Sequence, residues 1–196
     1  GRCWLYAGLN AIRPHVAERL GLDSFEFSTN YLFFWDKMEK ANAFLERVLE
    51  LSDLPVRDMK FQKLIGDPIG DGGYWQNAVD LVKKYGVMPA EAMPELAANE
   101  KSSSMNSVLG VLLRQGAYRL HQLKSDKKEG TIVAAKQEIL DQVYRILVLH
   151  LGEPVSTFSF RHKVKDEKGD MVWTPYQDYT PQSFAQAFVK EDMGDY

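Results

Sequence analysis

The sequence predicts an α+β fold that is mainly helical, because apolar residues recur at helical spacing along most of the chain. Hydrophobic residues make up 45% of the 196 residues and aromatic residues 12%, which suits a globular core. Helical spacing dominates from residue 4 to residue 151, whereas alternation of apolar and polar residues is confined to residues 155–176. We therefore expect packed helices with a single β-hairpin.

The first half of the chain is expected to hold three helices and one shaped loop. Apolar spacing predicts a helix from Trp4 to Leu20, in which Pro14 introduces either a kink or a break into two helices. Ser28 is a predicted N-cap for a helix of about six turns. Glycines and a proline at 68–73 then indicate a loop, and a further amphipathic helix follows it. That helix is expected to end at Gly86 in a left-handed conformation.

The second half is expected to hold a helical hairpin, a β-hairpin and a last helix. Helical spacing over 105–123 and 132–151 predicts two helices that pair across the polar turn SDKKEG, with the preceding NEKSSSMNS as a loop. Alternation on both sides of DEKGD predicts the β-hairpin at 155–176. Thr180 and Pro181 provide an N-cap and a first-turn proline for a helix through Val189.

Charge and cysteine content narrow the functional classes. Acidic and basic residues are mixed along the chain, with a net charge of -3, so no basic stripe favours nucleic-acid binding. No apolar run approaches the roughly 20 residues of a membrane-spanning helix. A single cysteine permits no disulfide within these residues and favours a reducing, cytoplasmic location.

That cysteine, Cys3 in GRCWLYAGLN, permits two interpretations. It directly precedes a helical pattern, where helix amides and the helix dipole stabilise a thiolate, which is the nucleophilic form. A free cysteine is also commonly a small buried apolar residue. Likewise, Gly72 and Gly73 can either expose backbone for pairing with a peptide, with Tyr74 and Trp75 beside an apolar pocket, or form a plain tight turn.

Taken together, GRCWLYAGLN and DGGYWQNAVDLVKKYG resemble the papain-like cysteine peptidases. The stretches EFSTNYLFFWDKMEKANAFLE, YGVMPAEAMPE and YRILVLHLGEP narrow the resemblance to the bleomycin hydrolase and aminopeptidase C family. The resemblance implies that Cys3 is the nucleophile and that Trp4 packs beside it. In the same way, it implies that Gly72 and Gly73 pair with the substrate backbone and that Tyr74 lies next to the apolar subsite, so that these three residues and Trp4 bind the substrate. It also implies peptide substrates, no cofactor and a homohexamer.

The same resemblance divides the chain into two parts. Residues 1–100 match a papain-like helical lobe that carries the nucleophile and the loop at Gly72 and Gly73, which we call the glycine loop. Residues 101–196 match a helical insert with the β-hairpin and the terminal helix. Aminopeptidase action is implied, through a thioester on Cys3. The alternative, which the residues alone leave open, is a non-catalytic helical interaction module with a structural cysteine.

The general base of such an enzyme is expected outside this sequence. In the family, a glutamine before the cysteine completes the oxyanion hole, and the catalytic histidine and asparagine lie far downstream, so the chain as given is expected to be an inactive fragment. His15, His121 and His150 are assigned to helices, and His162 is expected to point to solvent from the hairpin. No spacing of histidine or cysteine predicts a metal site.

Overall fold

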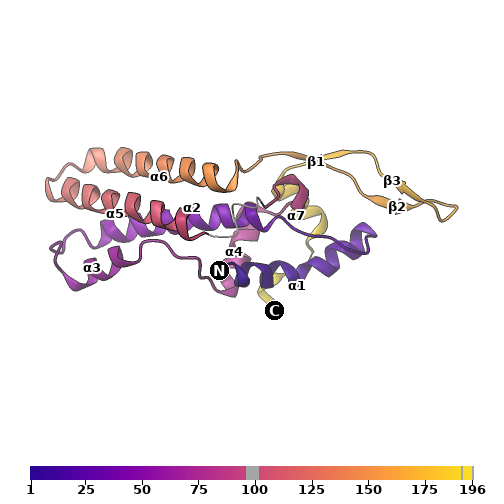
Figure 1. Ribbon diagram of the computed structural model, residues 1–196, viewed down its shortest axis with the longest axis horizontal. Helices are drawn as coiled ribbons and strands as arrows, with labels where there is room; N and C mark the ends of the chain where they lie inside the picture. Colours follow the sequence, from indigo (N-terminus) through magenta and orange to yellow (C-terminus); the bar gives the residue numbers. More distant parts are fainter. Residues whose placement is uncertain (96–101, 191, 196) are drawn as a thin grey trace. The chain divides into compact units, whose positions relative to one another are not determined.

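The computed structural model describes residues 1–95, 102–190 and 192–195, and it confirms the mainly helical α+β fold class (Figure 1). The helices are α1 (Cys3–Leu20), α2 (Thr29–Glu50), α3 (Met59–Gly66), α4 (Trp75–Tyr85), η1 (Ala90–Ala92), α5 (Ser103–Ser125), α6 (Glu129–Leu151), α7 (Pro181–Phe188) and η3 (Met193–Asp195). The strands are β1 (Phe158–Phe160), β2 (Lys163–Lys165), β3 (Met171–Trp173) and β4 (Gln177–Tyr179).

The chain forms two compact units that interleave along the sequence. Unit 1 comprises Gly1–Trp35, Gly72–Leu96 and Pro154–Tyr196, and unit 2 comprises Asp36–Asp71 and Ala97–Glu153. Helix α2 therefore begins in unit 1 and ends in unit 2. The two lobes expected from the sequence, 1–100 and 101–196, stay a prediction about family architecture.

In unit 1, α1 is one continuous helix that packs against α4 and α7. Pro14 lies inside the helix and does not end it, so the predicted break into two helices is wrong. A proline removes one backbone donor, and the buried stripe formed by Leu9, Ile12 and Val16 holds the two halves of the helix against the same core. Gly8 allows α4 to approach closely, since a Cβ there would lie 2.7 Å from the Cβ of Ala78.

The end of α4 differs from its expected geometry. Gly86 has a positive φ of 74°, but its ψ of -163° lies outside the left-handed helical region that was predicted. A Cβ at Gly86 would lie 2.2 Å from the carbonyl oxygen of Pro181, and Val87 donates to that same carbonyl at 3.1 Å. The glycine is needed because the start of α7 passes directly over this turn.

The β-hairpin is confirmed, and it extends further than the sequence indicated. Strand β2 pairs with β3 next to the turn at Asp166–Asp170, and β1 pairs with β4 further along the same two segments. The base of this ribbon contacts α7, because the ring of Phe184 packs against those of Phe160 and Tyr179. Thr180 caps α7 as predicted, with Ser183 donating its amide to the Thr180 hydroxyl at 3.0 Å.

Unit 2 contains the predicted helical hairpin, in which α5 and α6 lie side by side (Figure 1). Both helices begin before the predicted residues 105 and 132, because polar residues fill their first turns without apolar spacing. Gly116 lets α6 approach closely, since a Cβ there would lie 2.8 Å from Ile139 Cδ1. Helix α3 was not expected from the sequence; Asp58 caps it and Phe61 is buried.

Candidate active site

Cys3 is the first residue of α1, and its side chain is exposed. Arg2 occupies the N-cap position, and its carbonyl accepts hydrogen bonds from the amides of Leu5 and Tyr6 at 3.0 and 3.1 Å. The sulfur therefore lies at the positive end of an 18-residue helix, where an anion is favoured. An exposed position also distinguishes Cys3 from the usual buried cysteine.

Trp4 brings the glycine loop to the start of α1. A Cβ built on Gly73 would lie 2.5 Å from Trp4 Cε2 and 2.6 Å from Trp4 Cδ2. No side chain fits between this backbone and the indole, so Gly73 is packed directly on the residue that follows Cys3. The two sequence stretches that carry the resemblance thus meet in unit 1.

Gly72 and Tyr74, on either side of Gly73, are open to solvent. A Cβ at Gly72 would meet nothing within 4 Å, and Tyr74 is 83% exposed. The amide of Tyr74 donates to Asn77 Oδ1 at 2.7 Å, which fixes the point where the loop enters α4. The loop therefore presents a side-chain-free strip of backbone beside an exposed aromatic ring, a surface that can accept an extended peptide.

A polar cluster that the sequence did not reveal surrounds the first turn of α1. Glu95 Oε1 accepts hydrogen bonds from the Tyr6 hydroxyl at 2.6 Å and from Arg2 Nη1 at 3.3 Å. The Arg2 guanidinium also lies 4.0 Å from the centroid of the Phe33 ring. Partial burial, together with the hydrogen bond and charge of Glu95, raises the pKa of Tyr6 above its ordinary value. We call Arg2, Tyr6 and Glu95 the Glu95 cluster; it fixes the helix start that bears Cys3.

The four histidines have other surroundings. His15 lies on α1 twelve residues after Cys3, which corresponds to about 18 Å along the helix axis. In unit 2, His121 Nε2 lies 2.8 Å from the Leu54 carbonyl oxygen, and His150 Nδ1 lies 2.9 Å from that of Ile146. His162 does not simply point to solvent as predicted. It is half-buried, its ring stacks on Phe160 at 5.8 Å, and burial lowers its pKa.

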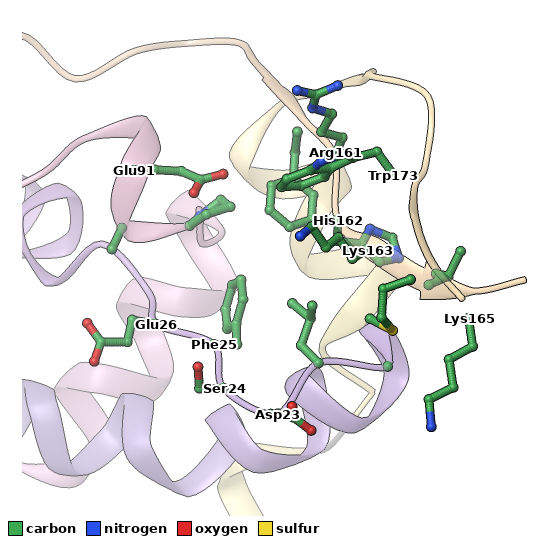
Figure 2. A pocket seen from close by; sticks show the side chains of 17 residues that line it. Asp23, Ser24, Phe25, Glu26, Glu91, Arg161, His162, Lys163, Lys165 and Trp173 are labelled. Atoms are coloured by element: carbon green, nitrogen blue, oxygen red, sulfur yellow. The ribbon is translucent and has the colours of Figure 1, made fainter. Parts of the chain in front are cut away.

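His162 lines a cavity of about 890 Å³ that is separate from the Cys3 region (Figure 2). The hairpin contributes Arg161, Lys163 and Lys165 to one side, and the segments around α1 and η1 contribute carboxylates, including Glu26 and Glu91, to the other. The Arg161 guanidinium is held by aromatic rings, 4.5 Å from the centroid of Trp173 and 4.4 Å from that of Tyr176. Neither Cys3 nor Gly73 lines this cavity.

The described residues contain neither a metal-ligand cluster nor a helix that could cross a membrane. Within 1–95, 102–190 and 192–195, no three His, Cys, Asp or Glu side chains gather in a way that could hold a metal ion. In the same part of the chain, no helix combines the length and apolar character that crossing a bilayer requires.

Comparison with known proteins gives one consistent result. The model of the Peptidase C1-like family matches residues 1–196. Aminopeptidase C of Lactobacillus delbrueckii subsp. lactis and aminopeptidase C of Listeria monocytogenes are each 38% identical to the whole chain, which covers 43% of either relative. A crystal structure of PepW from Lactobacillus rhamnosis HN001 superposes with a TM-score of 0.90 at 38% identity, over 100% of this chain and 43% of that one.

Proposed function

Because the chain belongs to the peptidase C1-like family, we propose that it supplies the nucleophile and the substrate loop of a cysteine aminopeptidase. The chain spans less than half the length of the curated relatives that it matches, so the activity is proposed for a protein of the relatives' full length. One observation carries the proposal: the exposed sulfur of Cys3 starts α1 while Gly73 is packed on the neighbouring indole of Trp4.

In the proposed reaction, the Cys3 thiolate attacks the first peptide carbonyl of the substrate. A C–S bond forms and the carbonyl oxygen becomes an oxyanion, stabilised by amides at the start of α1. When that oxyanion collapses, the C–N bond breaks and the shortened peptide leaves as an amine that takes up a proton. Water then attacks the thioester, which releases the amino acid and restores Cys3. The exposed backbone of Gly72 holds the substrate in an extended conformation.

The proton acceptor is proposed to lie outside these 196 residues. His15 is too far along α1 to reach Cys3, and His162 lines a different cavity. His121 and His150 are engaged with carbonyl groups of unit 2. General acid–base catalysis contributes about a hundredfold to ten-thousandfold to rate, so residues 1–196 alone are expected to be nearly inactive.

Three further features of the intact protein are proposed from the family resemblance alone. They are a bleomycin hydrolase-like specificity, a cytoplasmic location and a hexameric assembly with lobes at 1–100 and 101–196. The single cysteine agrees with a reducing compartment. Sedimentation of the intact protein tests the hexamer directly, since a monomer or dimer at micromolar concentration contradicts it.

The proposed activity is tested in the longest natural polypeptide that contains this chain. The substrates are an aminoacyl coumarin amide with a free amino group and its N-acetylated form. We expect cleavage of the free form alone, and Cys3→Ala to lower kcat/KM by about a thousandfold or more. Cleavage of the acetylated form at a similar rate would contradict aminopeptidase action.

Iodoacetamide labelling separates the enzyme from the alternative of a helical interaction module. A nucleophilic Cys3 in the intact protein reacts rapidly at pH 6, where an ordinary thiol is almost fully protonated. Equal labelling rates for Cys3 and for a free-cysteine peptide, together with no aminopeptidase activity in the intact protein, would instead support the module.

A further inference from the structure

A fully buried lysine lies close in space to the residues that precede the glycine loop. Lys37, on α2, has a side chain that is 0% exposed. Its Nζ donates to Asp71 Oδ1 at 2.6 Å and to the carbonyl oxygen of Gly70 at 2.7 Å. A buried ammonium group is costly unless it is paired and hydrogen-bonded, so these two contacts account for its presence in the core of unit 2.

Asp71 accepts two further hydrogen bonds from the start of α5. Ser102 Oγ donates to Oδ2 at 2.5 Å, and Asn106 Nδ2 donates to Oδ1 at 2.7 Å. The amide orientation of Asn106 follows from the carboxylate that it faces, because a flipped amide would place Oδ1, an acceptor, against Asp71 Oδ1. Burial favours the neutral acid, but the donors Asn106, Lys37 and Ser102 outweigh it and hold the pKa of Asp71 well below its ordinary value.

We call Lys37, Asp71, Ser102 and Asn106 the Lys37 cluster. It fixes the backbone at Gly70 and the side chain at Asp71, the two residues directly before Gly72. After the glycine pair, Asn77 binds the amide of Tyr74 at 2.7 Å. Two adjacent glycines lose much conformational entropy when ordered, and a residue directly before them that is already fixed leaves less of it to be lost when a ligand binds.

We propose that Asp71 is a positioning residue that pre-orders the Gly72–Gly73 backbone for pairing with a peptide. The inference rests on the proposed function, since it assigns Asp71 to the same substrate loop. Asp71 acts through the loop and is not itself a group that touches the reacting atoms. The alternative is that the Lys37 cluster only stabilises unit 2. Measured peptide affinity distinguishes the positioning role from this purely structural role.

The test uses the intact polypeptide in the Cys3→Ala background, where a peptide can bind without being hydrolysed. An alanine pentapeptide with a free amino end is titrated against Cys3→Ala and against Cys3→Ala with Asp71→Asn. We expect Asp71→Asn to raise Kd about tenfold, because the loop must then be ordered at the expense of binding. Asp53→Asn is the matched control, since Asp53 is 82% exposed and pairs only loosely with Lys124 at 3.7 Å.

Two milder variants keep the test decisive if Asp71→Asn folds poorly. Ser102→Ala and Asn106→Ala each remove one neutral donor to Asp71 and leave the ion pair with Lys37 intact. In otherwise active protein, each is expected to raise KM about threefold to tenfold with kcat and the rate of Cys3 alkylation unchanged. If the cluster had only a structural role, each variant would instead lower kcat, the rate of Cys3 alkylation and the folded fraction together.

The two proposals fail in different ways. Unchanged Kd and KM in folded Asp71→Asn, Ser102→Ala and Asn106→Ala overturn the positioning role and leave the peptidase proposal standing. Full activity in Cys3→Ala overturns the peptidase proposal, whatever the peptide affinities of the Asp71 variants are.

Discussion

The Lys37 cluster and the Glu95 cluster use similar chemistry in different surroundings. Each has one carboxylate that accepts hydrogen bonds from a basic side chain and from at least one neutral donor. The Asp71 side chain is 15% exposed and that of Lys37 0%, whereas Glu95 is 40% exposed and Arg2 9%. Water can replace a lost partner of Glu95 but not one of Lys37, so burial decides how much each contact contributes to stability.

The largest effect is expected for Lys37→Met. The substitution leaves the largely buried Asp71 carboxylate without its cation, and breaking a buried pair costs about 3–5 kcal/mol in the free energy of unfolding. Adding Asp71→Asn should recover most of that loss, because neither member of the pair is then charged. Urea unfolding of the two variants measures the difference. Equal stability of both would show that the pair behaves like a surface salt bridge.

Substitutions in the glycine loop are expected to have effects of intermediate size, and the effects should differ between Gly72 and Gly73. Gly73→Ala forces a Cβ against the Trp4 indole, which we expect to cost about 1–3 kcal/mol of stability. Gly72→Ala places its Cβ in open space and should leave thermal unfolding unchanged while it weakens peptide binding. Calorimetry and a peptide titration of both variants check this. Gly130→Ala, also in open space, is the control for the peptide titration and should leave peptide binding unchanged.

Acid should affect the Lys37 cluster through Asp71. Its pKa is lowered by folding from an ordinary value near 4, so the stabilisation is complete above that value and is lost as the pH falls towards the folded-state pKa. Stability measured by urea unfolding from pH 6 down to pH 2 should therefore fall more steeply for the native protein than for Asp71→Asn. Parallel curves for the two proteins would contradict a lowered pKa of Asp71 in the folded state.

Tyr31 gives the corresponding prediction in alkali. Burial raises its pKa to about 12, and its hydroxyl donates to the Tyr85 carbonyl at 2.9 Å. The stabilisation is present below the ordinary tyrosine pKa of about 10 and is lost as the pH rises through the folded-state value. Native protein should lose stability between these two pH values, and Tyr31→Phe should lose less.

The smallest effect is expected for Glu95→Gln. The Glu95 carboxylate is 40% exposed, so water can replace Arg2 as its partner and the pair contributes about 0–1 kcal/mol; the glutamine can still accept from Tyr6. The pKa of Tyr6 should move down towards its ordinary value, because the carboxylate charge contributes to raising it. Ultraviolet titration of the tyrosines, with Tyr6→Phe as the reference, detects that shift. A loss of several kcal/mol would show that burial does not distinguish the clusters.

Local rules predicted several elements correctly. Ser28 caps α2 by accepting from the Tyr31 amide at 3.1 Å, and Thr180 caps α7, because a cap depends on residues only three positions apart. The prediction of a kink or a break at Pro14 depends on the same local reasoning, and the break does not occur. Packing of α1 against α4 and α7 outweighed the one lost hydrogen bond.

The sequence contains one local signal for the Lys37 cluster. Lys37 follows Phe33 by four positions in FFWDK, so it lies on the buried face of its helix and requires a partner. Nothing local indicates that the partner is Asp71, or that Ser102 and Asn106 complete the site. Those residues are brought together by long-range packing of α2 and α5 within unit 2.

The sequence by itself determined the helical periodicity, the caps, the hairpin turn and the two motifs that carry the family resemblance, since each depends on neighbouring residues. Only the tertiary structure decided that Cys3 is exposed, that Gly73 is packed on Trp4, and that Asp71 is bound by three donors. The physical reason is that burial and distance depend on contacts between residues far apart in the chain, and pattern within a short window carries no information about them.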